Sequence, residues 1–85
     1  MIKRYVTDLA TRMGMNPPDV SLVEGQFLGC IDTHLVNIST KGRIVGALVF
    51  RKDLEYLANG VGCDRLEVRI RLALSRLQML LETLE

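Results

Sequence analysis

The chain has 85 residues, of which 11 are basic and 10 acidic, giving a net charge of +1. A chain of this length holds one domain, so we expect residues 1–85 to fold as a single unit. This near balance of basic and acidic residues argues against a protein that binds the phosphate backbone of nucleic acid, because such proteins carry a dominant basic surface. Hydrophobic residues make up 48% of the chain. Apolar surface that a small core cannot enclose favours an oligomer or a complex.

The first segment is predicted to be an amphipathic helix. Its apolar residues recur at i, i+3, i+4, i+7, i+8 and i+11, which is the helical period: they are Ile2, Tyr5, Val6, Leu9, Ala10 and Met13. Gly14 follows where a helix commonly ends in the left-handed conformation. Pro17 and Pro18 then prevent the helix from resuming.

The stretch from about Leu22 to Arg51 is predicted to form three antiparallel strands. The first covers the apolar residues up to Ile31, with two glycines that indicate a bulge or a close backbone approach. The second covers residues 34–39, and Thr40-Lys41-Gly42 is typical of a short hairpin turn. The third, residues 43–51, is almost continuously apolar. Such a run is typical of a strand covered on both faces, so we expect it in the centre of the sheet or at an interface.

Two helices are predicted after the sheet. Asp53 is expected to cap a short helix that ends near Asn59-Gly60. Asp64, with Glu67 three residues later, has the form of a capping box before a helix over residues 65–84. The alternation in residues 66–72 also fits a half-buried strand, but the cap and the long apolar continuation favour a helix. The expected fold class is therefore α+β: an N-terminal helix, a three-stranded antiparallel sheet, a short helix and a long C-terminal helix.

The last helix carries two apolar stripes. The main one contains Leu66, Ile70, Ala73, Leu74, Leu77, Leu80, Leu81 and Leu84, and the narrower one contains Val68, Leu72 and Met79. A helix with two apolar faces packs between two surfaces. One is expected to be the chain's own sheet and the other a second subunit, in a homodimer or heterodimer. We predict the dimer contacts at Leu66, Ile70, Leu77 and Leu80.

Few residues of the chain suggest a metal site, a catalytic site or a nucleic-acid-binding site. Cys30 and His34 are one loose pair about 13 Å apart along a strand, whereas a structural zinc site needs four ligands. A catalytic nucleophile needs an adjacent base and an orienting group, and no such set is present. We therefore predict no enzyme activity, catalytic residue, metal or cofactor. Arg65, Arg69 and Arg76 share one helix face, and binding of nucleic acid there is a less favoured alternative, since acidic residues dilute the charge along the same helix.

The chain also lacks the marks of secretion and of the membrane. No apolar run follows the first residues as in a signal peptide, and no stretch reaches the length of a membrane span. Two cysteines are too few for a disulfide scaffold. The expected compartment is the reducing cytosol, with both cysteines as free thiols.

With this order of elements, the chain resembles the class I chaperones of bacterial type III secretion systems. Residues 9–15 (LATRMGM) stand where the family's first helix ends in a Leu-Gly-Leu-like turn, and residues 23–31 (VEGQFLGCI) are similar to the start of its sheet. The hairpin at Lys41-Gly42, the strand from Ile44 to Phe50 and the closing helix continue the likeness. The chain is shorter than is usual in the family, which has a dimerisation helix and two further strands where only residues 53–62 stand here.

The resemblance implies a small cytosolic protein that uses no nucleotide and holds an extended segment of a secreted protein. Sheet edges would supply backbone hydrogen bonds and apolar patches would take the side chains. The implied partner-binding residues are Tyr5, Leu9 and Met13 on the first helix and Phe27, Leu48 and Phe50 on the sheet. Each of these residues could also belong to the core. A small subunit or regulator within a hetero-oligomeric complex is the main alternative function.

Overall fold

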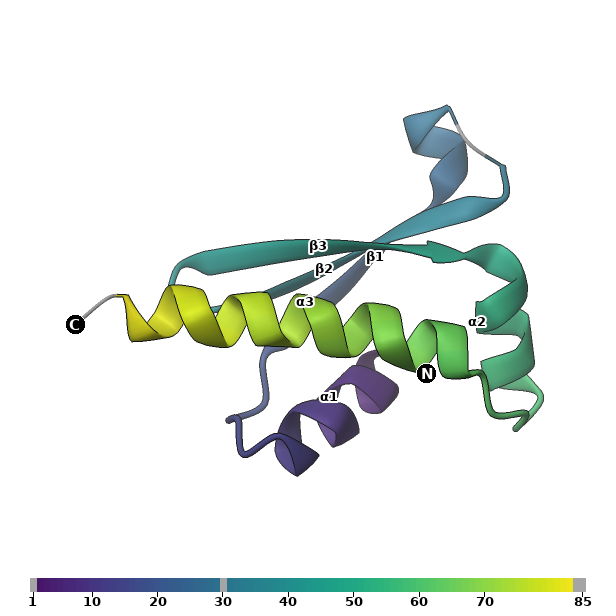
Figure 1. The fold of residues 1–85 in the computed structure, drawn as a ribbon. Coiled ribbons are helices and arrows are strands. Elements are labelled where there is room, and N and C mark those ends of the chain that lie inside the picture. Colours follow the sequence, from purple (N-terminus) through teal and green to yellow (C-terminus); the bar gives the residue numbers. More distant parts are fainter. Residues whose placement is uncertain (1, 30, 84–85) are drawn as a thin grey trace.

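The computed structural model describes residues 2–29 and 31–83 (Figure 1). The elements in chain order are helix α1 (Ile2–Arg12), strand β1 (Asp19–Val23), 3-10 helix η1 (Gly25–Leu28), strands β2 (Thr33–Thr40) and β3 (Arg43–Phe50), and helices α2 (Arg51–Ala58) and α3 (Asp64–Glu82). This order confirms the predicted α+β fold. No helix among the described residues has both the length and the apolar character needed to cross a bilayer.

The three strands form one antiparallel sheet in the order β1-β2-β3. The central strand is therefore β2, and β3 lies at an edge. Of the two places expected for the third strand, the centre of the sheet was wrong, and a position at an interface stays a prediction. The two hairpin residues, Lys41 and Gly42, both have positive φ, at 51° and 79°. This backbone is typical of the two-residue turns that match the twist of paired strands.

The first strand is shorter than predicted and begins earlier. It ends at Val23, and the glycine-containing stretch after it forms η1 instead of a strand. The backbone N–H of Gly25 donates to Nδ1 of His34 at 2.8 Å, and Gly29 has a φ of 79° that an extended strand does not adopt. The glycines thus mark the place where the chain leaves the sheet.

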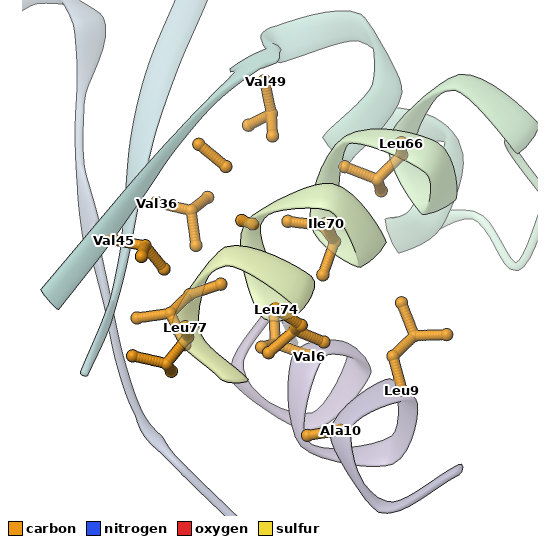
Figure 2. Close-up of a cluster of buried hydrophobic side chains, with 13 residues drawn as sticks. Val6, Leu9, Ala10, Val36, Val45, Val49, Leu66, Ile70, Leu74 and Leu77 are labelled. Atoms are coloured by element: carbon orange, nitrogen blue, oxygen red, sulfur yellow. The ribbon is translucent and has the colours of Figure 1, made fainter. Parts of the chain in front are cut away.

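Helices α1 and α3 cover one face of the sheet, and η1 stands away from them (Figure 1). The core lies between these helices and the sheet and draws on α1, β2, β3 and α3 (Figure 2). Its members are Val6, Leu9, Ala10, Val36, Ile38, Val45, Ala47, Val49, Leu66, Ile70, Ala73, Leu74 and Leu77. Among residues 2–29 and 31–83, no α-helix packs against the opposite face of the sheet (Figure 1).

The two predicted caps are not formed as expected. Helix α2 begins at Arg51 after Phe50, so Asp53 lies inside its first turn. Helix α3 begins at Asp64 after Cys63, with no side-chain hydrogen bond at the cap. Glu67 instead pairs with Arg71 at 3.7 Å, one turn further along. Residues 66–72 are helical, so the alternative reading of this stretch as a strand was wrong.

Candidate protein-binding surface

Strand β3 buries only one of its two apolar faces. Val45, Ala47 and Val49 lie in the core, whereas Ile44 is 66% exposed and Leu48 is 54% exposed. The strand register places Leu48 beside Leu35 of β2, and Leu35 beside Val23 of β1. Side chains of paired residues share one face of a sheet. We call the uncovered face, with Val23, Leu35, Ile44 and Leu48, the outer face.

Within the described part of the chain, no strand pairs with the far side of β3. In an antiparallel pair, alternate residues direct both backbone groups toward the partner strand and the residues between them direct theirs away. The two-residue turn makes Thr40 and Arg43 a bonded pair, so the backbone groups of residues 44, 46 and 48 point away from β2. We call Ile44, Gly46 and Leu48 the β3 free edge. Unpaired strand groups of this kind are a template for another chain.

A groove of about 290 Å³ separates the β3 free edge from α3. It is lined by Gly46, Ala47, Leu48, Arg69, Leu72, Ala73 and Arg76. The Arg69 side chain crosses the groove, and its Nη1 donates to the backbone carbonyl oxygen of Leu48 at 3.1 Å. One of the unpaired carbonyl groups is therefore covered by a side chain and not by a strand.

The corner where β3 meets α2 and α3 fixes the arginines in place. Nε and Nη2 of Arg65 donate to the two carboxylate oxygens of Asp53 at 2.9 and 2.7 Å. The guanidinium groups of Arg65 and Arg69 lie over the Phe50 ring, 4.3 and 4.9 Å from its centroid. Both contacts hold the arginines against the end of β3. We call Arg65, Arg69 and Arg76 the arginine row.

Asp53 is a fully buried carboxylate at 0% exposure. The hydrogen bonds from Arg65 hold the pKa of this carboxyl below its ordinary value, and they outweigh burial, which acts in the opposite direction. The same hydrogen bonds raise the pKa of Arg65. Asp53 is therefore the ionised anchor that joins α2 to α3, and not the helix cap that its position in the sequence suggests.

The predicted partner-binding residues do not form one surface. On α1, Leu9 is in the core, while Tyr5 and Met13 are partly buried against it. Burial, followed by the nearby Glu67 carboxylate, raises the pKa of the Tyr5 hydroxyl. Leu48 lies on the outer face, which is the opposite face of the sheet from α1.

Phe27 and Phe50 complete the predicted partner-binding set. Phe50 is partly buried beneath the arginines at the end of β3. The side chain of Phe27 lies outside the described part of the chain. Among the described members of the predicted set, Leu48 and Phe50 meet at Arg69, which contacts both, whereas Tyr5, Leu9 and Met13 lie in or against the core.

Three of the four predicted dimer residues lie in the chain's own core. Leu66, Ile70 and Leu77 are at most 1% exposed, so they are not available to a second subunit in this conformation. Leu80 is partly exposed at 38%. The narrower stripe of α3, with Val68, Leu72 and Met79, is exposed instead.

The residues considered for metal binding have other surroundings. His34 accepts the backbone hydrogen bond from Gly25 through its Nδ1, and Cys30 lies outside the described residues. Cys63 is half-buried immediately before α3. In residues 2–29 and 31–83, no three of the potential ligands His, Cys, Asp and Glu come together.

Comparisons with protein-family models, with curated proteins and with solved structures gave no significant match to this chain. The resemblance to secretion chaperones therefore stays an expectation. Of the surface described above, the sequence indicated the exposed Leu48 and the common face of the arginines. It gave no sign that Asp53 binds Arg65, or that the groove joins the arginines to the edge of β3.

Proposed function

We propose that this chain is a protein-binding module that holds an extended segment of another protein along the β3 free edge. One observation carries the proposal: Ile44 and Leu48 are exposed apolar side chains on a strand whose edge pairs with no other strand among the described residues. Added strands gain affinity from backbone hydrogen bonds and specificity from alternate side chains. The free edge and the outer face supply these two kinds of contact side by side.

The local geometry fits a segment laid beside β3. An added strand would pair its backbone with Ile44, Gly46 and Leu48, and its N–H would replace Arg69 at the Leu48 carbonyl. Leu35 packs over Gly46, since a Cβ built on that glycine would lie 3.1 Å from Leu35 Cδ1. Alternate side chains of the segment would extend the apolar row of Leu35 and Leu48 on the outer face.

This function agrees with the resemblance to class I type III secretion chaperones, which bind extended segments of secreted proteins. As part of the proposal we place the protein in the cytosol. The binding uses backbone hydrogen bonds and apolar contacts, so it needs no cofactor and no catalytic residue.

A second candidate function rests on a different observation. The exposed stripe of Val68, Leu72 and Met79 on α3 would suit a folded partner in a hetero-oligomeric complex. Such a partner would cover one side of the helix and leave the backbone groups of β3 unpaired. The two candidates therefore differ in which part of the chain the partner protects.

Amide hydrogen exchange distinguishes them. In the free chain the amides of Ile44, Gly46 and Leu48 should exchange fast, while those of Val45 and Ala47 are protected by β2. The protein serves as bait in cytosol from its source, and limited proteolysis maps the protected region of any bound chain. This region is then synthesised and titrated. Strand addition predicts new protection at the three outward amides.

Two proline variants provide the matched test. Leu48→Pro removes an outward N–H from the β3 edge, and Leu22→Pro removes one from the β1 edge, without loss of a sheet hydrogen bond. We expect only Leu48→Pro to abolish binding. Binding that persists in Leu48→Pro, with no new protection in β3, would refute strand addition and favour a partner on α3.

A further inference from the structure

The arginine row runs parallel to the β3 free edge. Its members stand at i, i+4 and i+11 of α3 and therefore share one face. Arg65 lies beside Phe50, Arg69 beside Leu48, and Arg76 lines the groove with Gly46 and Leu48. A strand added at this edge would thus have positive charge along its α3 side for most of its length.

The charges of the row are not equally engaged. Arg65 is held by the buried Asp53 carboxylate. Among the described residues, Arg69 and Arg76 form no ion pair, although Arg71 on the same helix pairs with Glu67. Arg69 and Arg76 lie on either side of the exposed Leu72 in the groove. Arg69 and Arg76, which have no carboxylate partner among the described residues, therefore flank the apolar side chain of Leu72.

Arg69 and Arg76 are far enough apart to reach different side chains of one extended segment. At about 1.5 Å per helical residue, Arg69 and Arg76 are roughly 10 Å apart along α3. Side chains on one face of a strand recur every 7 Å or so. Two or three successive side chains on the α3 side of an added segment would then lie within reach of the long Arg69 and Arg76 side chains.

We infer that the segment held at the β3 free edge alternates acidic and apolar side chains, an inference that rests on the proposed function. The acidic side chains face α3 and bind Arg69 and Arg76. The apolar side chains face the other way and join Ile44 and Leu48 on the outer face. Arginine suits this role because its planar group binds carboxylates through two parallel hydrogen bonds.

Charge argues against a second copy of this chain at the same edge. Two copies paired edge to edge are related by a twofold axis perpendicular to the sheet, which keeps both arginine rows on the same side. Arg69 and Arg76 of each copy would then face the same residues of the other. Like charges brought together at an interface are unfavourable, whereas an acidic segment neutralises them.

The groove also fits a peptide better than a nucleic acid. Besides the arginines, it is lined by the edge of β3 and by the apolar residues Leu72 and Ala73 of α3. Phosphate binding would use the arginines but would leave the unpaired backbone groups of Ile44, Gly46 and Leu48 without a partner. An extended peptide satisfies both sets of groups.

Three synthetic, end-capped peptides test the inference. Valine alternates with glutamate in the first, with glutamine in the second and with lysine in the third, and binding is followed by fluorescence anisotropy at low salt. We expect the glutamate peptide to bind about tenfold more tightly than the glutamine peptide. The lysine peptide should bind most weakly, and added salt should reduce the glutamate preference.

Charge-neutral variants locate the effect. The double variant R69Q/R76Q should bind the glutamate and glutamine peptides equally, and R71Q should keep the preference because Arg71 faces away from the groove. Since Arg69 also contacts Phe50, the single variant R76Q is measured too and should lose part of the preference. Circular dichroism of each variant checks that the fold is intact.

Each outcome has a distinct meaning. Equal binding of the glutamate and glutamine peptides to the unmodified chain would overturn the acidic inference and leave the proposed strand addition standing. Failure of all three peptides to bind would overturn both. Tighter binding of a single-stranded DNA oligonucleotide than of the glutamate peptide, lost in R69Q/R76Q, would assign the row to nucleic acid. A dimer in light scattering that Leu48→Pro dissociates would assign the edge to a second copy.

Discussion

The buried Asp53 carboxylate gives a prediction whose size follows from its contacts. It accepts two hydrogen bonds from Arg65, at 2.9 and 2.7 Å, and hydrogen bonds between charged groups contribute roughly 1.5–3 kcal/mol each. The Arg65 side chain is 52% exposed, so solvent screens the pair, and we take the two bonds together to contribute about as much as one unscreened bond, roughly 2 kcal/mol. Asp53→Asn should therefore reduce the free energy of unfolding by about 2 kcal/mol at neutral pH.

This loss is large for a small domain. A chain of this size has a total stability of roughly 4–13 kcal/mol, and 2 kcal/mol corresponds to a fall in Tm of about 10 °C. Urea unfolding followed by circular dichroism measures the change without adding salt. Glu55→Gln is the control, because Glu55 lies on the same helix in an exposed pair with Arg51. Its effect should be about 0.5 kcal/mol or less.

The dependence on pH gives the prediction a second test. The pKa of Asp53 is lower in the folded chain than its ordinary value of 3.8. Its contribution is therefore complete above the unfolded pKa and is lost as the pH falls through the folded pKa. The difference between the unmodified chain and Asp53→Asn should be constant near neutral pH and shrink below about pH 4. A difference that is negligible at neutral pH, or unchanged in acid, would refute the role given to the pair.

Two further predictions concern the core and the hairpin. Leu77→Ala should lower the free energy of unfolding by about 3 kcal/mol at every protein concentration, because Leu77 is fully buried within one chain. Urea unfolding should show a much smaller loss for Met79→Ala, because Met79 is 65% exposed. A loss at Leu77 that depends on protein concentration would instead indicate that Leu77 lies in a dimer interface. Gly42→Ala should cost about 1 kcal/mol, since Gly42 has a φ of 79° with open space around it. Gly62→Ala, at a glycine without positive φ, should leave the thermal unfolding midpoint unchanged or raise it slightly, and equal losses at the two glycines would contradict the turn geometry.

Local signals in the sequence were sufficient for most of the fold. The apolar period of residues 2–13 predicts α1. Gly14 ends this segment in the left-handed conformation, which glycine adopts more readily than other residues. The long apolar continuation after residue 72 correctly outweighed the strand-like alternation before it. These features depend on neighbours within one or two turns of the chain, which a sequence displays directly.

Contacts between distant residues were not predicted. The position of Asp53 near a helix start predicted a cap, but a partner 12 residues away, Arg65, takes its carboxylate. The stripe of Leu66, Ile70 and Leu77 fits a dimer seam as well as it fits a core. Periodicity shows that one face of a helix is covered, but it does not show whether the cover comes from the same chain or from another.

The apolar run of β3 is the place where sequence and single-chain structure disagree most. The run predicts cover on both faces, but α3 covers only one and leaves Ile44 and Leu48 exposed. An added strand in line with β3 would widen the sheet, bring its own apolar side chains beside Ile44 and Leu48, and pair the backbone groups of the edge. A partner on α3 alone would cover Val68 and Met79 but would leave these exposed side chains of β3 unchanged. The segment proposed here therefore accounts for a feature of the sequence that the core of one chain, and a partner bound only to the helix, leave unexplained.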